Sequence, residues 1–255
     1  MRLMRVCAFA LALLTALLPR TAPAADAVDA AVVLAADVSR SINTEEFDLQ
    51  RQGYAAAITS PRLMEAIHSG PHGAIALSFV EWAGESEQKV VVEWTIIRNK
   101  EDAGKFAAAL LAPPRSFLGR TAIGSAIDFS MVVLGESGIA ADRRVIDVSG
   151  DGTSNQGRPA PAARDVALKA GVVINGLAIY NKQAAAIGGY LELHTNPPGG
   201  LAKYYRDNVT GGIGSFVLPI DDFNSFGEAM IRKLVTEIAE ARPGGAPADA
   251  GVGGG

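Results

Sequence analysis

The sequence predicts an α/β fold, with a doubly wound, mainly parallel central sheet, helices on both faces and one antiparallel edge strand. Short apolar runs such as AAVVLAA (30–36) and VVINGLAI (172–179) alternate with amphipathic stretches, as in strands joined by crossover helices. These runs are nearly continuous, which is typical of strands buried on both faces. The polar segment WAGESEQ (82–88) joins two further runs and predicts a hairpin, hence one antiparallel pair.

Local signals define the individual elements. Glu45 and Glu46 lie in the first turn of a helix over 44–60, where the helix dipole favours anions. Gly171 ends a helix over 160–170. The predicted strands are 30–36, 74–81, 89–95, 143–149, 172–179 and 215–220, and the other predicted helices are 99–112, 121–134, 201–208 and 222–241.

The two ends of the chain differ from this pattern. Residues 1–24 contain Arg2 and Arg5, then an uncharged apolar run, then Ala22-Pro23-Ala24, which is the order of a secretory signal peptide. The apolar run is shorter than the roughly 20 residues of a membrane span. We therefore expect cleavage near Ala24, a periplasmic or secreted protein, and no transmembrane segment in the mature chain.

The remaining chain divides into a folded domain over 26–241 and a tail over 242–255. The tail consists mainly of Gly, Ala and Pro and has no large apolar side chain other than one valine, so it is predicted to be disordered. The formal net charge is −4, which argues against a nucleic-acid partner because such proteins carry a basic face. The one cysteine, Cys7, lies in the predicted signal peptide, so the mature chain is expected to contain no disulfide.

Three predicted loops carry hydroxyl and carboxylate groups at the ends of strands or before a helix. Asp37, Ser39 and Ser41 follow the first strand, Asp151 follows the strand over 143–149, and Thr121 opens the helix over 121–134. Alternate residues of an extended segment point the same way, so the first three side chains can converge. Hard oxygen donors of low total charge suit Mg²⁺, and ligands bind at the carboxyl ends of strands in such sheets. We therefore expect a metal site formed by these five residues.

These motifs resemble those of the von Willebrand factor A (vWA) domain, whose metal-ion-dependent adhesion site (MIDAS) combines D-x-S-x-S with a later Thr and a later Asp-Gly. The phrases DVSRSI, SFVEWAG and GDGTSN more narrowly resemble the secreted bacterial DUF1194 family. The vWA resemblance implies that Ser39, Ser41 and Thr121 are hydroxyl ligands of Mg²⁺, Mn²⁺ or Ca²⁺, and that Asp37 and Asp151 bind it directly or through water. It also implies a protein partner whose Asp or Glu carboxylate completes the shell. One departure is Gly150, where the family usually has Thr.

Three functions stay open at this point: a metal-dependent protein-binding module, a metal-assisted phosphoryl hydrolase that uses the same site, and a metal-independent structural domain. No catalytic motif such as G-x-S-x-G or a P-loop is present, so we expect no enzyme activity. His68 and His72 are separated by helix-breaking residues and are expected to bind no metal. His194 is expected at the surface, and Glu81 in a solvated turn.

Overall fold

A computed structural model of the chain describes residues 27–240. The predicted signal peptide (1–24) and the predicted tail (242–255) lie outside the described residues.

The centre of the molecule is a single sheet. Its strands in the described range are β1 (Val28–Asp37), β2 (Ile75–Trp82), β3 (Gln88–Ile97), β4 (Ala141–Gly150), β5 (Val173–Ile179) and β6 (Val217–Ile220). Their order is β3-β2-β1-β4-β5-β6. Neighbouring strands are parallel except β2 and β3, which are antiparallel. The predicted doubly wound sheet with one antiparallel edge strand is confirmed.

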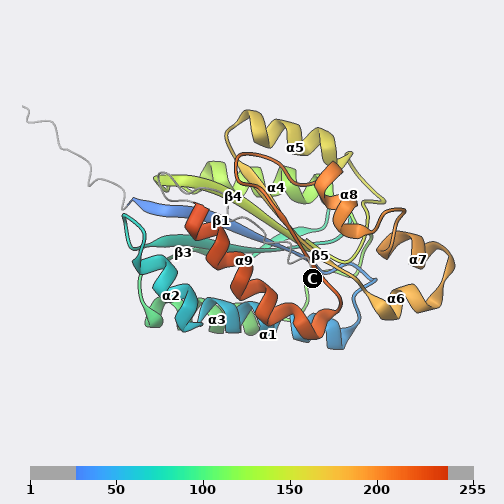
Figure 1. The fold of residues 1–255 in the computed structure, drawn as a ribbon, viewed down its shortest axis with the longest axis horizontal. Coiled ribbons are helices and arrows are strands. Elements are labelled where there is room, and N and C mark those ends of the chain that lie inside the picture. Colours follow the sequence, from blue (N-terminus) through green and yellow to red (C-terminus); the bar gives the residue numbers. More distant parts are fainter. Residues whose placement is uncertain (1–26, 241–255) are drawn as a thin grey trace, which may run out of the picture.

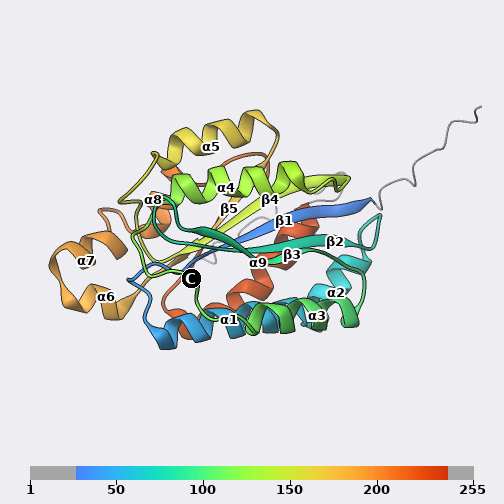
Figure 2. The same cartoon turned by 180° about the vertical axis from the view of Figure 1, so that it is seen from behind.

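Helices cover both faces of this sheet (Figures 1 and 2). One face packs against α1, α2, α3 and α9, the other against α4, α5 and α8, and α6 and α7 extend beyond the carboxyl ends of the strands. The helices are α1 (Thr44–Ile58), α2 (Pro61–His68), α3 (Lys100–Leu111), α4 (Ile123–Glu136), α5 (Ala160–Lys169), α6 (Lys182–Ile187), α7 (Gly189–Thr195), α8 (Leu201–Asn208) and α9 (Phe226–Glu240), and a 3₁₀ turn, η1, spans Phe223–Ser225.

The strand residues divide between two apolar cores. Val32 and Leu34 of β1 belong to the core beneath α1 and α9, whereas Val33 and Ala35 belong to the core beneath α4 and α5. All ten residues of β1 are buried, because side chains that alternate between the faces meet a helix layer on each. Burial on both faces explains the unbroken apolar run that predicted this strand.

The strand order reverses between β1 and β4, which lie side by side at the centre of the sheet. The chain leaves β1 toward β2 on one side and leaves β4 toward β5 on the other. Ala36 pairs with Ser149 across these two strands, so the loops that follow them emerge at the same edge. Such a reversal is where open α/β sheets bind ligands.

Helix α1 begins directly after the first of these loops. Asn43 caps it: its side-chain oxygen accepts a hydrogen bond from Glu46 N at 3.0 Å, while the Glu46 carboxylate accepts from Asn43 N at 2.8 Å. This reciprocal pair satisfies two backbone donors at the helix start. Gly53 lets α9 approach, because a Cβ at this position would lie 2.5 Å from the Phe226 ring.

Three helices were not predicted from the sequence. Helix α2 begins at Pro61, in the first position of a helix capped by Ser60, a placement that proline favours. Helices α6 and α7 are short and are separated by Gly188, whose φ of +77° suits glycine.

Helix α4 begins at Ile123, later than predicted, so Thr121 lies in the preceding loop.

Candidate metal centre

The structure brings all five predicted ligands together at the carboxyl ends of β1 and β4. Asp37 is the last residue of β1, Asp151 follows β4, and Thr121 precedes α4. Ser39 Oγ lies 3.1 Å from Ser41 Oγ and 3.3 Å from Thr121 Oγ1. Ser41 Oγ donates a hydrogen bond to Asp151 Oδ1 at 2.7 Å. Three loops that are far apart in the sequence therefore form one cluster of oxygens.

The spacing of these oxygens fits a small divalent cation. Octahedral ligands at about 2.1 Å from an ion lie about 3 Å from one another, close to the Ser39–Ser41 and Ser39–Thr121 distances. Asp37 Oδ1 accepts from Ser39 N at 2.7 Å, but Asp37 Oδ2 is buried and has no hydrogen-bond partner within residues 27–240. An unsatisfied buried carboxylate oxygen is costly, and a cation or its bound water would satisfy it. The donor set therefore fits the ion that the vWA resemblance implies.

The two carboxylates of the site lack a neutralising partner. Burial and the neighbouring Asp151 raise the pKa of Asp37 well above its usual value. Burial also raises the pKa of Asp151 to about 6, although hydrogen bonds from Asn181 and Ser41 act to lower it. Within residues 27–240, neither carboxylate forms an ion pair with Lys or Arg. A bound divalent cation would favour the charged form of both groups.

The positive charge of Arg115 acts on Asp37, but the guanidinium itself is used to hold the first loop. Its guanidinium donates to the backbone carbonyls of Val38, Ser39 and Ile42 at 2.5–3.1 Å. The pKa of Arg115 is lowered by burial and raised by several carboxylates, Asp37 foremost. Arg115 thus orients the D-x-S-x-S loop and favours the charged state of Asp37 without contacting its carboxylate.

The expectation that Glu81 lies in a solvated turn was wrong. Glu81 ends β2 next to the site loops and is fully buried. Its Oε1 forms a 2.6 Å ion pair with Arg51, and its Oε2 accepts from Ser116 N at 2.8 Å. Glu81 therefore anchors the segment that carries Arg115, a role that the end of an apolar strand gave no reason to expect.

The departure at Gly150 has a structural explanation. A Cβ at position 150 would lie 2.6 Å from Tyr205 Oη and 2.9 Å from Asp37 Oδ2, so the tyrosine hydroxyl occupies the space that a larger residue needs. Tyr205 is fully buried and its hydroxyl has no hydrogen-bond partner among the described residues. Burial, followed by Asp37 and Asp151, raises the pKa of Tyr205 well above its usual value. A neutral hydroxyl therefore lies beside the unpaired oxygen of Asp37.

Two asparagines hold the loops in place. Asn181, which caps α6, donates from Nδ2 to Asp151 Oδ2 at 2.8 Å and to the Ser41 carbonyl at 3.1 Å. The Asn155 side chain accepts from Thr121 N at 3.0 Å, and Asn155 N donates to the Thr121 carbonyl at 2.8 Å. Asn155 thus ties the Asp151 loop to Thr121.

The expectation of a surface position for His194 was wrong, and His194 is the site residue that sequence reasoning missed. Only 4% of His194 is exposed. Its Nε2 lies 3.3 Å from Thr121 Oγ1, and its Nδ1 lies 3.2 Å from Thr153 Oγ1. Burial and the positive charge of Arg40 lower the pKa of His194 to about 4, so the imidazole is neutral at neutral pH. The i, i+4 spacing of Tyr190 and His194 was the available sequence signal, and the two rings stack at 5.6 Å.

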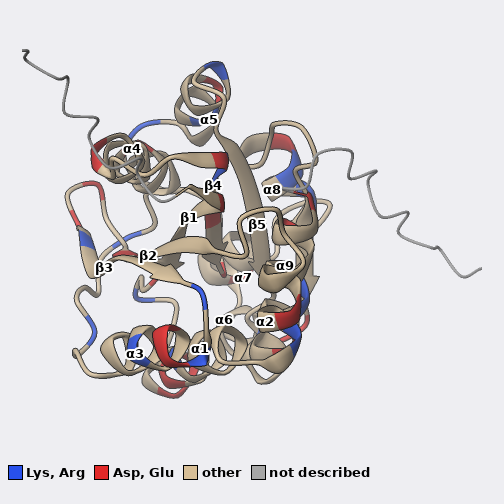
Figure 3. Ribbon diagram, turned by 90° about the vertical axis from the view of Figure 1, so that its left-hand side faces the viewer, with Lys and Arg blue, Asp and Glu red and all other residues tan. Residues whose placement is uncertain are grey.

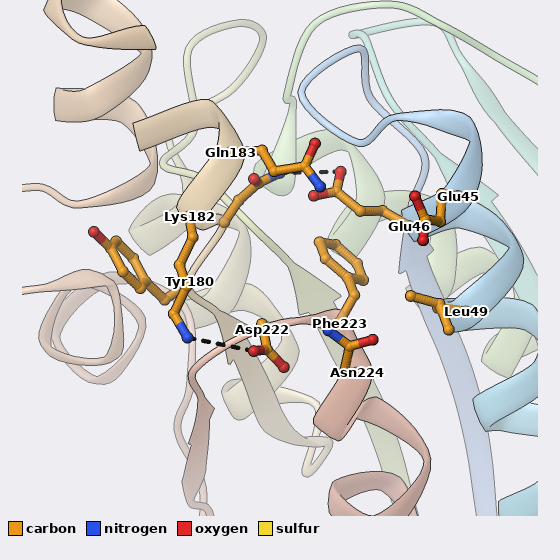
Figure 4. A pocket seen from close by; sticks show the side chains of 10 residues that line it. Glu45, Glu46, Leu49, Tyr180, Lys182, Gln183, Asp222, Phe223 and Asn224 are labelled. Carbon is orange, nitrogen blue, oxygen red and sulfur yellow. Dashed lines mark hydrogen bonds and ion pairs between the residues drawn. The ribbon is translucent and has the colours of Figure 1, made fainter. Parts of the chain in front are cut away.

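Three cavities adjoin these residues, and the largest of the three, of about 430 Å³, is lined by Arg40, Ser41 and Tyr190. Another, of about 10 Å³, is lined by Ser41, Thr121 and His194, with Arg40 and Arg120 at its rim, and has room for about one water-sized particle. The third, of about 240 Å³, lies between α1, α6 and η1 (Figure 4). Three carboxylates line it, and among the described residues Asp222 pairs with Lys182 at 3.3 Å, whereas Glu46 is buried and accepts hydrogen bonds from Asn43 and Asn181. Of the three, the smallest cavity is the one lined by two of the candidate ligands, Ser41 and Thr121.

A second group of potential ligands lies at the opposite end of the sheet. Asp29, His72 and Asp142 present ligand atoms within 4.8 Å of one another. The Asp29 carboxylate accepts from His72 N at 2.9 Å and from Ala74 N at 3.4 Å, so it stabilises a turn. His72 Nε2 lies 3.1 Å from Asp142 Oδ2, and both side chains are partly exposed. His72 therefore belongs to a group that could hold a metal ion, contrary to the expectation for it, whereas His68 Nε2 lies 2.9 Å from the Arg98 carbonyl.

Charges elsewhere on the described surface are mixed. In the view of Figure 3, acidic and basic residues are interspersed around the outer helices, with no continuous basic face. None of the helices between residues 27 and 240 combines the length and apolarity that a membrane span requires.

The fold and the loop arrangement define a vWA-like domain, and solved structures agree. Proximal thread matrix protein 1 from the mussel byssus matches with a TM-score of 0.59 and 17% identity over 84% of this chain and 48% of its own. The pilus adhesin SpaC of Lactobacillus rhamnosus GG matches with a TM-score of 0.60 and 13% identity, over 83% of this chain and 30% of its own. A von Willebrand factor type A protein from Catenulispora acidiphila has a TM-score of 0.55 and 14% identity, over 83% of this chain and 43% of its own. This chain thus spans half or less of each of these proteins.

The chain belongs to the DUF1194 family, described as a protein family of unknown function, which matches residues 27–242. A comparison with curated proteins finds no match. A further crystal structure of the mussel protein is described with a zinc-occupied MIDAS motif.

Proposed function

We propose that this chain is an exported domain that binds a protein partner through a divalent cation held by Asp37, Ser39, Ser41, Thr121 and Asp151. The observation that carries this proposal is the buried, un-neutralised carboxylate pair facing three converging hydroxyls, with Asp37 Oδ2 unpaired. Five oxygen donors alone favour Mg²⁺, with Mn²⁺ and Ca²⁺ as alternatives.

The proposed partner presents an Asp or Glu carboxylate to the ion. With the three hydroxyls as direct ligands and the two carboxylates bound through water, the ion keeps an electrophilic open position, and an anionic group is attracted to it. Arg40 and Arg120 at the rim of the small cavity add positive charge at the same place. The printed descriptions of two fold neighbours, a pilus adhesin and a byssus matrix protein, are consistent with adhesion. The signal peptide predicted over residues 1–24 supports a binding event in the periplasm or outside the cell.

Metal dependence is tested first by thermal unfolding of the full mature chain. An ion at 100 times its dissociation constant contributes about 2.7 kcal/mol, which raises Tm by about 5–10 °C in a domain of this size. Asp37→Ala should abolish this shift, whereas Asp142→Asn, at the other end of the sheet, should preserve it. An unchanged Tm in Mg²⁺, Mn²⁺ and Zn²⁺ relative to EDTA would exclude the metal-dependent function.

Partner binding is tested by affinity purification from the envelope of the source cells. We expect a specific protein to be retained with a divalent cation, released by EDTA, and absent with Asp37→Ala. Asp142→Asn again serves as the matched control. Retention that is indifferent to EDTA and to Asp37→Ala would instead support a metal-independent structural domain.

A metal-assisted phosphoryl hydrolase is the second candidate, because the structure places His194 at the site. The imidazole Nε2 lies 3.3 Å from the Thr121 hydroxyl, within the range of a proton-transfer partner. Turnover of a phosphate ester that is lost in both Asp37→Ala and His194→Ala would establish this activity, and we expect none.

A further inference from the structure

His194 is held in one orientation beside the predicted ligands. It lies near the end of α7, and its carbonyl accepts a hydrogen bond from Thr153 N at 3.0 Å. The Thr153 hydroxyl lies 3.2 Å from Nδ1 on one side of the ring, and the Thr121 hydroxyl lies 3.3 Å from Nε2 on the other. Tyr190 stacks on the ring with an interplanar angle of 12°. The direction of Nε2 is therefore set by four contacts.

The chain leaves room for this close approach. A Cβ at Gly152 would lie 2.1 Å from His194 Nε2, so only glycine at this position lets the imidazole pack against the Asp151 loop. The cavity of about 10 Å³ is lined by Ser41, Thr121 and His194. Two of the proposed oxygen ligands and one imidazole thus enclose a space of roughly the size of one water or ion.

The distance from Nε2 to Thr121 Oγ1 matches the separation of two ligands on the same ion. At 3.3 Å it equals the separation of Thr121 Oγ1 from Ser39 Oγ and is close to the roughly 3 Å edge of an octahedral shell. If Nδ1–H donates to Thr153, the lone pair of Nε2 faces the cavity. A histidine ligand whose second nitrogen is held by a hydrogen bond is the usual arrangement at protein metal sites.

We infer that His194 is a nitrogen ligand of the proposed ion, and that it shifts the preference of the site from Mg²⁺ toward Zn²⁺ and similar ions. Imidazole suits Zn²⁺, Cu²⁺ and Ni²⁺, whereas Mg²⁺ prefers oxygen ligands and retained water. This inference rests on the proposed function, in which the five oxygen-bearing residues hold a divalent cation.

The first test measures Zn²⁺ and Mg²⁺ affinity of the full mature chain by calorimetry. We expect His194→Ala to weaken Zn²⁺ binding at least tenfold, as loss of a metal ligand does, and to change Mg²⁺ binding less than threefold. His68→Ala is the matched control, because His68 is exposed and lies on α2 at the opposite end of the molecule. Circular dichroism and Tm without metal establish that each variant folds.

The second test needs no change at His194. The chain contains three histidines, so in His68→Ala/His72→Ala any imidazole signal comes from His194. We expect nitrogen hyperfine coupling in the electron paramagnetic resonance spectrum of this variant loaded with Cu²⁺.

The results distinguish the ligand role of His194 from the metal site formed by the five oxygen-bearing residues. Zn²⁺ affinity unchanged in His194→Ala, or no nitrogen coupling in the double variant, would overturn the ligand role. If Asp37→Ala still abolishes metal binding in that case, the oxygen site stands. If the unaltered chain binds neither Zn²⁺ nor Mg²⁺, the proposed function fails as well.

Discussion

Two groups of buried carboxylates differ in whether a positively charged side chain lies next to them. Beneath the centre of the sheet, Lys233 of α9 lies 2.5 Å from Asp147 Oδ1 and 2.5 Å from Glu237 Oε1, and all three residues are fully buried. Asn175 adds a 2.9 Å hydrogen bond to Glu237. At the ends of the strands, Asp37 and Asp151 are equally buried, but among the described residues their hydrogen-bond donors are hydroxyl, amide and backbone groups.

This difference separates stability from function. Burial lowers the pKa of Lys233, but the opposite effect of Asp147 and Glu237 is larger, so the pKa lies above its usual value. Lys233 is therefore a cation that the chain itself supplies to these carboxylates. Burial and Glu237 still raise the pKa of Asp147 to about 7. In the described part of the chain, the pair at the strand ends has no such cation, and in the proposed function an ion from solution balances its charge. We therefore expect changes to the Lys233 group to unfold the protein and changes to the Asp37 pair to alter metal binding.

The largest effect is predicted for Lys233→Met. This change leaves two buried carboxylates without a cation, and breaking a buried ion pair in this way costs about 3–5 kcal/mol. The free energy of unfolding from urea titration at pH 7.5 measures the loss. Adding Asp147→Asn and Glu237→Gln to the same chain should recover most of it, because no uncompensated charge remains. Full stability of Lys233→Met alone would show that these three groups are not the ion-pair cluster described above.

The next effect is a pH dependence of the metal-free chain in EDTA. The folded pKa of Asp151 is about 6, against 3.8 for an ordinary Asp, so the folded carboxyl binds its proton more tightly than the unfolded one. Its contribution to the free energy of unfolding is therefore fully present below about pH 4 and is lost as the pH rises through about 6. The difference amounts to up to about 3 kcal/mol.

Asp151→Asn removes this contribution together with the part of the Asp37 shift that Asp151 causes, whereas Asp147 titrates in the same direction in both chains. The variant should lose less stability than the unaltered chain between pH 4 and pH 7.5. A saturating divalent cation should remove or reverse the difference, since it favours the charged carboxylate. Parallel pH profiles for the two chains in EDTA would contradict the burial argument.

The sequence was sufficient for the parts of the site that depend on short local patterns. Asp37, Ser39 and Ser41 follow a strand recognisable from its apolar run, and strand order alone brings Asp151 to the same edge. The antiparallel hairpin of β2 and β3 was also predictable, because a short polar segment joins two apolar runs. These features need only neighbouring residues and the known chemistry of strand ends.

The rest depends on contacts between distant segments. His194 reaches Thr121 across 73 positions of the sequence and Glu81 pairs with Arg51 across 30. Nothing within α7 or β2 specifies these partners. Tyr205 is a second example. The sequence shows that Gly150 replaces the usual Thr of the family, but the hydroxyl that fills the space of that side chain belongs to Tyr205 of α8, far along the chain. Short helices such as α6 and α7, which flank a pair of glycines, also lack the periodicity that predicts longer helices.

The Gly150–Tyr205 contact provides the third prediction. Gly150→Ala should reduce the free energy of unfolding by about 1–3 kcal/mol, as overpacking of a buried position does, because the new methyl group would lie 2.6 Å from Tyr205 Oη. Tyr205→Phe should recover part of this loss, since it removes the nearest atom but leaves Asp37 Oδ2 at 2.9 Å. A double-mutant cycle measured by urea unfolding gives the coupling, and strict additivity would show that the two positions do not compete for space.

The smallest effect is predicted for Asp142→Asn. This change tests whether an exposed carboxylate matters for stability, as the Lys233 group does, or for metal binding, as the Asp37 pair is proposed to do. Asp142 is 46% exposed and its contact with His72 is screened by solvent, so the change in unfolding free energy should stay below about 0.5 kcal/mol. The cation-induced rise in Tm should be the same as in the unaltered chain, because water already stabilises this carboxylate. Loss of that rise in Asp142→Asn, with retention in Asp37→Ala, would reverse the comparison and assign the ion to the Asp29, His72 and Asp142 group.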